Sequence, residues 1–179
     1  MKHCSSCGEL VARKTPDGDS KERWVCGSCD TIHYQNPKVV VGCVPEKDGK
    51  ILLCKRAIEP RYGYWTVPAG FMELGETIAQ GAARETLEEA CAEVTIGHLF
   101  ASVDVVQAGQ LHLFFTATLD GGFAAGDESL DVRLFAKDEI PWEEIAFRSG
   151  KFALEKYLED NGRNQGVHIH EVVFRRGKE

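Results

Sequence analysis

Residues 70–92, GFMELGETIAQGAARETLEEACA, decide the fold of this chain. Thr77 and Gln80 make a Thr-x-x-Gln capping box, which predicts that a helix begins at Thr77. Small, mostly apolar side chains then recur at helical spacing and predict the face of the helix that packs. These side chains are Ala79, Ala83, Thr86, Leu87 and Ala90.

Three glutamates of the same helix stand at positions i, i+3 and i+4. Glu85, Glu88 and Glu89 are therefore expected on the opposite face, within a single turn. Like charges at this spacing destabilise a helix by about 0.2–0.5 kcal/mol per pair. A hard divalent cation such as Mg²⁺ or Mn²⁺ would offset that repulsion, because these ions prefer oxygen ligands. A solvated helix face is the alternative for the triplet taken alone.

The wider spacing around the triplet is more specific. Gly70 is followed after five residues by Glu76, after seven more by Arg84-Glu85, and after two more by Glu88-Glu89. This pattern resembles the box of the Nudix hydrolases, a loop–helix–loop whose glutamates bind the metals that cleave nucleoside diphosphates linked to another group. The resemblance implies an α/β fold, the Nudix α/β/α sandwich around a mixed β-sheet, over residues 37–160.

The end of the box departs from the family pattern. Cys91 stands where the family usually has glycine, and Ala92 stands where it has a bulky aliphatic residue. A glycine would let the chain leave the helix through a left-handed conformation, which costs cysteine more free energy. The sequence therefore predicts either a helix that runs slightly past Ala92 or a strained exit. Neither change removes a carboxylate.

The resemblance implies a metal site built from oxygen atoms. Glu85 and Glu89 are the expected principal ligands of Mg²⁺ or Mn²⁺, and Glu88 is a third ligand or holds a water molecule. In the family, the carbonyl of the residue before the box glycine often joins the metal sphere. That residue is Ala69 in this chain.

The other charged residues of the site are expected to brace it or to move a proton. Glu76 and Arg84 would brace the loop before the helix by ion pairing. The general base is either a glutamate of the box or Glu128, which follows a later loop. For Glu128, an exposed loop acid is an equally good interpretation.

Two basic and several aromatic side chains are candidates for substrate contact. Arg56 and Arg61 flank the loop before Tyr64-Trp65, and one or both could reach substrate phosphates, although a surface role fits each at least as well. An adenine or flavin ring could stack on an aromatic side chain, and each aromatic candidate could instead belong to the core. These candidates are Tyr34, Tyr64, Trp65 and Phe71.

Four cysteines near the start of the chain have the spacing of a zinc site. Cys4-x2-Cys7 and Cys26-x2-Cys29 fit four-cysteine coordination, and residues 16–19 predict the turn of a hairpin between the two pairs. Thiolate coordination would fold a segment that has almost no core. The zinc is expected to be structural, because four cysteines leave no open position for water. Residues 1–33 are therefore predicted to be a small β zinc ribbon.

The rest of the chain predicts a single α/β domain and a short extension. Cys43 and Cys54 fall inside apolar strands and are expected to be buried. Residues 161–179 are expected to form a C-terminal extension, in which 167–174 is an edge strand or a dimer contact. The other expected elements are strands at 39–44, 51–55, 94–106, 110–119 and 130–135, a helical turn at 141–145, and a helix at 151–160.

Composition excludes several classes of protein. The formal net charge of −7 argues against broad binding to nucleic-acid backbones, which requires clustered lysine and arginine. Seven cysteines are an odd number, and the chain opens with no signal peptide, so a disulfide framework is not expected. No apolar run reaches the length of a membrane span, and we expect a cytoplasmic protein.

Substrate choice is indicated by family resemblance alone. A ribbon ahead of a Nudix domain is similar to the NADH pyrophosphatases, but their Ser-Gln-Pro-Trp element after the box is absent. The ADP-ribose enzymes often have a proline downstream of the box, where this chain has Gln-Ala-Gly at 107–109. The plant chloroplast FAD pyrophosphatases share the ribbon and the segments 34–38, 68–70 and 128–135. This resemblance implies FAD as the substrate, followed by ADP-ribose.

Other functions fit the same sequence. A Nudix-type sensor would bind ADP-ribose or NAD without cleaving it, although the complete set of glutamates argues against this. Hydrolysis of NADH or removal of mRNA caps would use the same chemistry on another substrate, and a ribbon-led nucleic-acid binder is the further alternative. Nudix domains commonly pair as homodimers, so a homodimer is possible.

Overall fold

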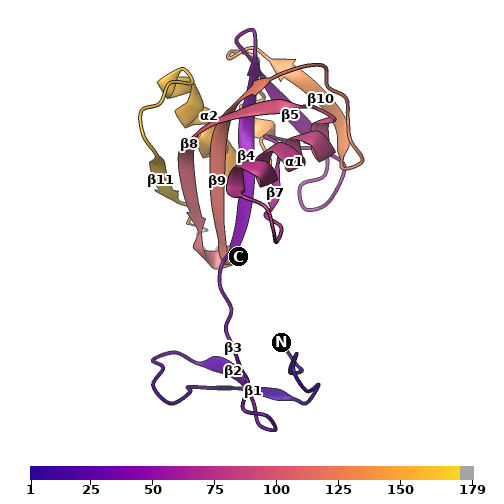
Figure 1. Ribbon diagram of the computed structural model, residues 1–179. Coiled ribbons are helices and arrows are strands. Elements are labelled where there is room, and N and C mark those ends of the chain that lie inside the picture. The colour runs from indigo at the N-terminus through magenta and orange to yellow at the C-terminus, as the bar shows by residue number, and fades with distance from the viewer. Residues whose placement is uncertain (174–179) are drawn as a thin grey trace, which may run out of the picture. The chain divides into compact units, whose positions relative to one another are not determined.

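The computed structural model describes residues 1–173 and divides the chain into two compact units, Met1–Asn36 and the part from Pro37 onward. The strand expected at 167–174 therefore reaches beyond the described residues at its last position. The first unit is a three-stranded antiparallel sheet (Figure 1), and the hairpin predicted between the cysteine pairs joins its first two strands. These strands are β1 (Val11–Lys14), β2 (Arg23–Cys26) and β3 (Ile32–His33).

The second unit is built on one mixed sheet of eight strands (Figure 1). The order along the sheet is β10-β5-β4-β9-β8-β11, while β6 pairs with β5 and β7 pairs with β4. The β4–β9 and β8–β11 pairs are parallel, and the other pairs are antiparallel. The strands are β4 (Lys38–Lys47), β5 (Lys50–Arg56), β6 (Trp65–Thr66), β7 (Ala69–Phe71), β8 (Val94–Val105), β9 (Gln110–Leu119), β10 (Ser129–Phe135) and β11 (His168–Glu171).

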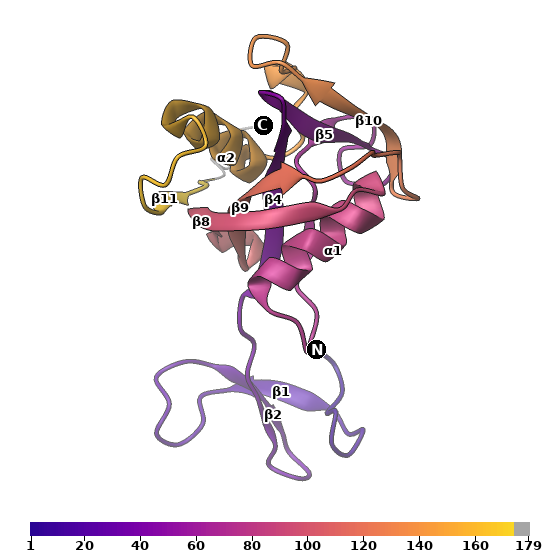
Figure 2. The same cartoon turned by 45° about the horizontal axis from the view of Figure 1, so that its top comes forward.

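Two helices cover opposite faces of this sheet (Figure 2). Helix α1 (Ile78–Ala90) packs its Ala82 against Val41 and Cys43 of β4, whereas α2 (Arg148–Asp160) packs its Leu154 in the cluster on the other face. Two short 3₁₀ helices, η1 (Val106–Ala108) and η2 (Trp142–Glu144), lie in the connections. The architecture is the predicted α/β/α sandwich around a mixed sheet.

The structure confirms the predicted start of α1 and decides between the two alternatives for its end. The capping box is present, because the Gln80 N–H donates to Thr77 Oγ1 at 3.2 Å and the Thr77 N–H donates to Gln80 Oε1 at 2.8 Å. The helix ends at Ala90, and Cys91 adopts the left-handed conformation with φ 45° and ψ 38°. The strained exit is therefore the correct alternative, and the helix does not run past Ala92.

The face of α1 that packs is the predicted one only in part, because Thr86 and Ala90 are buried as predicted. Leu87 is 52% exposed, while Glu85 and Glu89 lie on the buried face. Gly81 allows a close approach to the sheet, since a Cβ at this position would lie 2.7 Å from Val41 Cγ2. The helix therefore lies close to β4 and β7, and the carboxylates that follow Gly81 by one and two turns point into the fold.

The strands around α1 fix its position. Cys43 of β4 and Cys54 of β5 are buried, as predicted, and Cys43 Sγ lies 3.1 Å from Thr86 Oγ1 of α1. The sequence did not predict β6 and β7, which are two and three residues long. No helix of residues 1–173 is long and apolar enough to cross a membrane.

Candidate active site

Strand β7 brings backbone groups against two carboxylates of α1. The Ala69 N–H donates to Glu89 Oε2 at 3.2 Å. Gly70 lies against the carboxylate of Glu85, and a Cβ at position 70 would come within 2.5 Å of Glu85 Oε1. Glycine is required there, because any side chain would displace the carboxylate. Ala69 and Gly70 of β7 thus lie directly against the carboxylates of Glu89 and Glu85.

Burial changes the ionisation of both carboxyl groups. Glu85 is 9% exposed and Glu89 is 6% exposed. Burial raises the pKa of Glu89 to about 8, and the charges of Glu85 and Glu128 act in the same direction. The pKa of Glu85 is also raised, chiefly by burial. Buried carboxylates in one cluster repel one another, and a cation between them would relieve that repulsion.

Arg84 connects the other glutamates of the box. Its Nε and Nη2 form two hydrogen bonds to the carboxylate of Glu76, both at 3.0 Å. Its Nη1 donates to Glu85 Oε1 at 2.8 Å and to Glu88 Oε2 at 3.1 Å. Glu88 is exposed, unlike the other two box glutamates of α1. The guanidinium therefore links the loop before the helix to Glu85 and Glu88.

The loop before β10 is attached to the end of α1. The Ala124 N–H donates to the Ala90 carbonyl at 2.9 Å, and the Gly126 N–H donates to the Glu89 carbonyl at 3.1 Å. A Cβ at position 126 would overlap with the Glu88 carbonyl oxygen. This attachment holds Glu128 close enough for its charge to raise the pKa of both buried glutamates.

The donor set of this site suits a hard divalent cation. The carboxylates of Glu85, Glu88 and Glu89 and the carbonyl of Ala69 are all oxygen donors, which Mg²⁺ and Mn²⁺ prefer. The three carboxylates do not form a cluster in which every ligand oxygen lies within 4.8 Å of the others; among the side chains of residues 1–173, such a cluster is formed by the ribbon cysteines. Arg84 holds Glu85 and Glu88 by hydrogen bonds instead.

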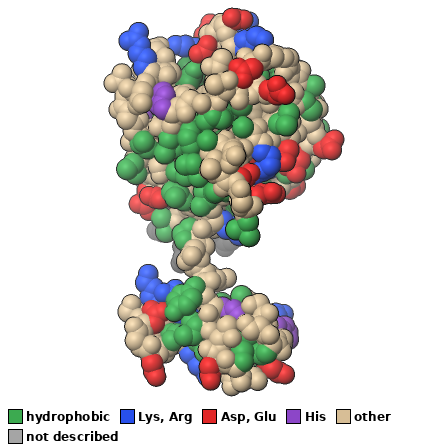
Figure 3. Space-filling model, viewed as in Figure 1, with side chains coloured by type: hydrophobic (Ala, Val, Ile, Leu, Met, Phe, Trp, Pro, Cys, Tyr) green, Lys and Arg blue, Asp and Glu red, His purple; other side chains and the backbone are tan. Residues whose placement is uncertain are grey.

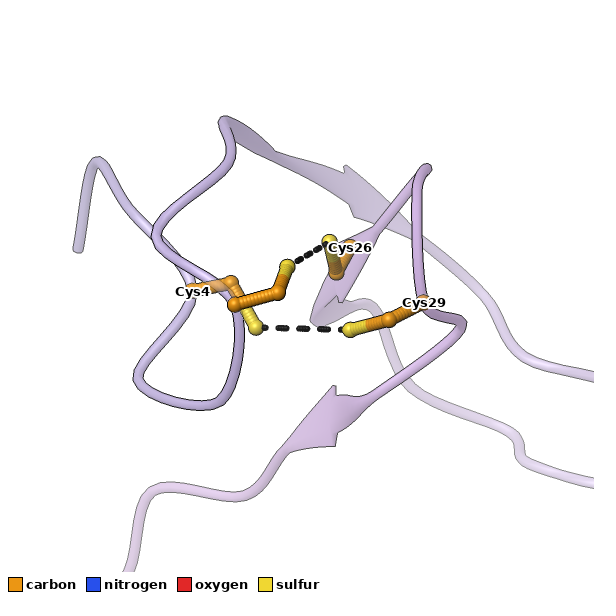
Figure 4. Close-up of side chains that lie close together, drawn as sticks. Cys4, Cys26 and Cys29 are labelled. Carbon is orange, nitrogen blue, oxygen red and sulfur yellow. Dashed lines mark hydrogen bonds between the residues drawn. The ribbon is translucent and has the colours of Figure 1, made fainter.

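The four ribbon cysteines form a compact sulfur cluster (Figure 4). Their Sγ atoms all lie within 4.8 Å of one another, with Cys4–Cys29 at 3.7 Å and Cys7–Cys26 at 3.5 Å. Although burial opposes it, hydrogen bonds from backbone N–H groups and from His33 lower the pKa of Cys4 to about 5. Four thiol groups in this arrangement fit tetrahedral zinc.

The basic candidates for substrate contact differ in their surroundings. Arg56 is only 8% exposed, and its Nε donates to the Pro60 carbonyl at 2.9 Å. Arg61 is exposed, and its Cζ lies over the ring of Tyr64, 5.3 Å from the ring centroid. Both residues belong to β5 or to the loop after it, and the Ala57 N–H of that loop donates to the Glu128 carbonyl at 2.8 Å.

The aromatic candidates do not form one stacking site. Trp65 is buried, and its ring packs edge-on against Phe135 with centroids 4.9 Å apart, so a base cannot stack on it without disrupting the core. Of the two alternatives given for Trp65, its burial favours a core residue over a substrate contact. Phe71 is 49% exposed beside the box, where Lys38 Nζ lies 5.0 Å from its ring centroid. Tyr34 is exposed and belongs to the first unit.

The surface around α1 combines these features (Figure 3). Acidic side chains surround a basic one on this face, next to a broad area of hydrophobic side chains over the sheet. In the described structure, the ion pairs of this helix run from Arg84 to Glu76, Glu85 and Glu88. The exposed acidic side chains on this face thus lie around Arg84, while Glu85 and Glu89 lie beneath the surface.

Comparisons with known proteins identify the family of this chain. The model of the NUDIX domain family matches residues 36–156, and the zinc-ribbon model described as Nudix N-terminal matches residues 2–35. A NUDIX hydrolase from Nitrosomonas europaea of known crystal structure is 52% identical, with a TM-score of 0.92, and the match covers 96% of this chain and 99% of that one.

Two curated relatives have names that state a substrate. The NAD-capped RNA hydrolase NudC of Vibrio vulnificus is 32% identical over 79% of this chain and 53% of its own length. The ADP-ribose pyrophosphatase of Methanocaldococcus jannaschii is 31% identical over 72% of this chain and 78% of its own length. The chain thus spans about half the length of the NudC relatives that it matches. The chain belongs to the NUDIX family of hydrolases, and its Nudix domain follows a zinc ribbon of the Nudix N-terminal type.

Proposed function

We propose that this protein is a metal-dependent pyrophosphatase. It hydrolyses the pyrophosphate bond of a nucleoside diphosphate that is linked to another group. The observation that carries the proposal is the burial of Glu85 and Glu89 against β7, with the charge of Glu128 in reach of both. A cluster of carboxylates under this mutual repulsion supports a site for divalent cations rather than a solvated helix face.

The box residues divide into ligands and supports. Glu85, Glu88 and Glu89, together with the Ala69 carbonyl, would hold Mg²⁺ or Mn²⁺. When bound, these ions neutralise charge on the pyrophosphate and lower the pKa of a water molecule. Arg84 orients Glu85 and Glu88 through the hydrogen bonds of its Nη1.

Supporting residues then keep the ligands in place. Glu76 fixes Arg84 through two parallel hydrogen bonds and also accepts from the Glu73 N–H at 2.7 Å, so the loop before α1 is held to the helix. Glu128 is the proposed general base, because its loop is attached to the end of α1 and its charge acts on both buried glutamates. A glutamate of the box is the alternative base.

Substrate contacts are proposed for two basic residues and one aromatic residue near the site. Arg56 and Arg61 would bind phosphate oxygens, and Phe71 offers an exposed ring beside the box. The zinc of the ribbon would be structural, since four cysteines fill its coordination. A cytoplasmic location and a possible homodimer belong to the same proposal and rest on the sequence features given above.

The substrate is proposed to be a dinucleotide such as FAD, or else ADP-ribose. Resemblance to the FAD pyrophosphatases supports FAD, whereas the name of one relative supports ADP-ribose. The NudC relatives are named as NAD-capped RNA hydrolases, so capped RNA is an alternative substrate despite the negative charge of the chain. A sensor that binds ADP-ribose or NAD without cleaving it is the non-catalytic alternative.

A panel of substrates tests this proposal. FAD, ADP-ribose, NADH and NAD-capped RNA would be compared by kcat/KM with saturating Mg²⁺ or Mn²⁺. We expect one of them to be split, and Glu89→Gln to cut turnover at least about a hundredfold with folding unchanged. Glu93→Gln, an exposed glutamate just past α1, is the matched control. Binding without cleavage would identify a sensor, and normal turnover by Glu89→Gln would refute the metal assignment.

A further inference from the structure

Arg56 is a buried cation beside the proposed site. It ends β5, where it lies opposite Ser129 in the sheet, directly after Glu128. Among the described residues, no carboxylate lies within 4.0 Å of its guanidinium nitrogens. A largely buried guanidinium without a carboxylate partner carries a desolvation cost, which an anionic ligand would offset.

One edge of this guanidinium is already occupied. Its Nε donates to the Pro60 carbonyl at 2.9 Å, and the Arg56 backbone is held by hydrogen bonds with Gly63 and Tyr64. The two Nη nitrogens have no hydrogen-bond partner among the described residues. Among residues 1–173, His98 Nε2 is the single side-chain nitrogen or oxygen that is both fully buried and without a hydrogen-bond partner. The two Nη atoms of Arg56, which also lack a partner, are therefore not fully buried. The outer edge of the guanidinium is thus open to a ligand.

An aromatic ring from a distant part of the chain lies against the guanidinium of Arg56. Arg56 Cζ lies 5.0 Å from the centroid of the Phe147 ring. Phe147 precedes the first turn of α2, and the segment before it is attached to β6, because the Ala146 N–H donates to the Trp65 carbonyl at 2.8 Å. A guanidinium over an aromatic ring gains cation–π attraction, which is strongest when the pair is shielded from water.

We propose that Phe147 is a positioning residue that holds the Arg56 guanidinium flat, with its two Nη nitrogens directed at the diphosphate oxygens of the substrate. The contact with Pro60 fixes one edge and the ring fixes the plane, so the remaining rotation of the side chain is removed. The Ala57 N–H donates to the Glu128 carbonyl at 2.8 Å, which holds the end of β5 that carries Arg56 beside the loop of the proposed base. This inference rests on the proposed pyrophosphatase function.

The variant Phe147→Leu tests whether the aromatic ring, and not merely an apolar side chain, is needed beside Arg56. Leucine keeps an apolar side chain under Arg56 but removes the aromatic face, so we expect kcat/KM to fall about tenfold. Phe147→Tyr restores the ring and should stay within about twofold of the wild type. Because Arg56→Lys removes the planar group that stacks, Phe147→Leu should add little to that variant.

Controls separate positioning from stability. Phe152→Leu changes the same residue type in α2, where the ring lies 5.8 Å from Lys156 Nζ, and should leave kcat/KM unchanged. Thermal unfolding of each variant shows whether a loss is merely structural. A folded Phe147→Leu with wild-type kcat/KM, or a Phe147→Tyr as impaired as Phe147→Leu, would overturn the inference while leaving the proposed function in place.

Binding of inorganic pyrophosphate gives a readout that does not need turnover. Calorimetry with magnesium pyrophosphate should show affinity lowered about tenfold in Phe147→Leu and restored in Phe147→Tyr. If the wild type cleaves no substrate of the panel, the proposed function fails, and this measurement alone decides the inference. Equal affinity in the wild type and Phe147→Leu, or no binding by the wild type, would contradict it.

Discussion

The carboxylate of Glu85 lies in the space that a side chain at position 70 would occupy. A Cβ on Gly70 would come within 2.5 Å of Glu85 Oε1, and the carbon of the carboxyl group is equally close. Strand β7 and helix α1 therefore meet with no spare volume at the proposed metal site. Glu85, a proposed metal ligand, can therefore take its position only because residue 70, fifteen residues earlier in the chain, has no side chain.

Gly70→Ala should consequently displace Glu85. We expect a free energy of unfolding lower by about 1–3 kcal/mol, the usual cost of overpacking, and a kcat/KM lower by at least about tenfold. Denaturant unfolding and the substrate panel measure the two effects. Gly122→Ala is the matched control, because a Cβ there meets nothing within 4 Å. Wild-type kinetics in Gly70→Ala would show that Glu85 need not hold this position.

Gly126→Ala tests the placement of Glu128. The added methyl group would overlap with the Glu88 carbonyl oxygen and break the hydrogen bond from the Gly126 N–H to the Glu89 carbonyl. We expect the loop to move away from α1, with kcat reduced at least about tenfold because the proposed base loses its position. Steady-state kinetics compared with Gly122→Ala provide the measurement. An unchanged kcat in the folded variant would favour a box glutamate as the base.

Removal of zinc should unfold the ribbon and spare the Nudix domain. Cys26→Ser takes one of the four thiolates from the cluster, and the segment has little core to replace it. Metal analysis should find one zinc ion per chain in the wild type and none in the variant. The substrate panel, with excess Mg²⁺, should show activity retained. Cys91→Ser, which changes an exposed cysteine outside the ribbon, should keep its zinc.

His112 should make stability depend on pH. Burial lowers the pKa of its ring to about 4, while Ser149 Oγ and Gln110 Oε1 lie 2.9 Å and 2.8 Å from its two nitrogens. An unfolded histidine has a pKa near 6.5, so below that pH the unfolded state binds more protons. The stabilisation is complete above pH ~6.5 and is lost as the pH falls toward 4.

The measurement compares wild type with His112→Gln by urea unfolding at pH 7.5 and pH 5. Acid also affects the cysteine site, but that contribution is common to both proteins. We expect the wild type to lose about 1 kcal/mol more stability than the variant, less than full linkage predicts because the ring is only partly buried. If both proteins lose the same stability between pH 7.5 and pH 5, the His112 ring takes up a proton in the folded state as readily as in the unfolded state.

Local signals in the sequence were sufficient for the start of α1 and for the central strands, whereas they left two alternatives for the end of α1. The capping box at Thr77 and Gln80 involves neighbours in the chain, and so it operates before any tertiary contact forms. The apolar run of β4 is equally local. The spacing of the glutamates was enough to indicate the family.

The burial of individual side chains on α1 could not be predicted in this way. Hydrophobic periodicity places Leu87 inside, yet it is exposed, while Glu85 and Glu89 are buried. The assumption that apolar residues pack fails where a site needs buried charge. Small residues such as Gly81 and Ala82 form the actual contact with the sheet.

Contacts between distant segments were also beyond the sequence. Three contacts near the site join residues that are separated by many positions in the chain. They are the pairing of β7 with β4, the attachment of Gly126 to α1 and the contact of Phe147 with Arg56. Nothing in the local sequence of Phe147 distinguishes it from a core residue. A glycine that precedes Asp127 and Glu128 suggests only a turn.

The parallel pairing of β4 with β9 has a consequence for the order of folding. It joins Val41 to Leu113 and Gly42 to Phe114 at the centre of the sheet, across the whole of α1 and β8. Closing so long a loop costs entropy before any contact compensates for it, and such pairings slow the rate-limiting step. The ribbon pairs Val11 with Cys26 over a short loop. We therefore expect the ribbon to acquire its zinc while the centre of the Nudix sheet is still unpaired.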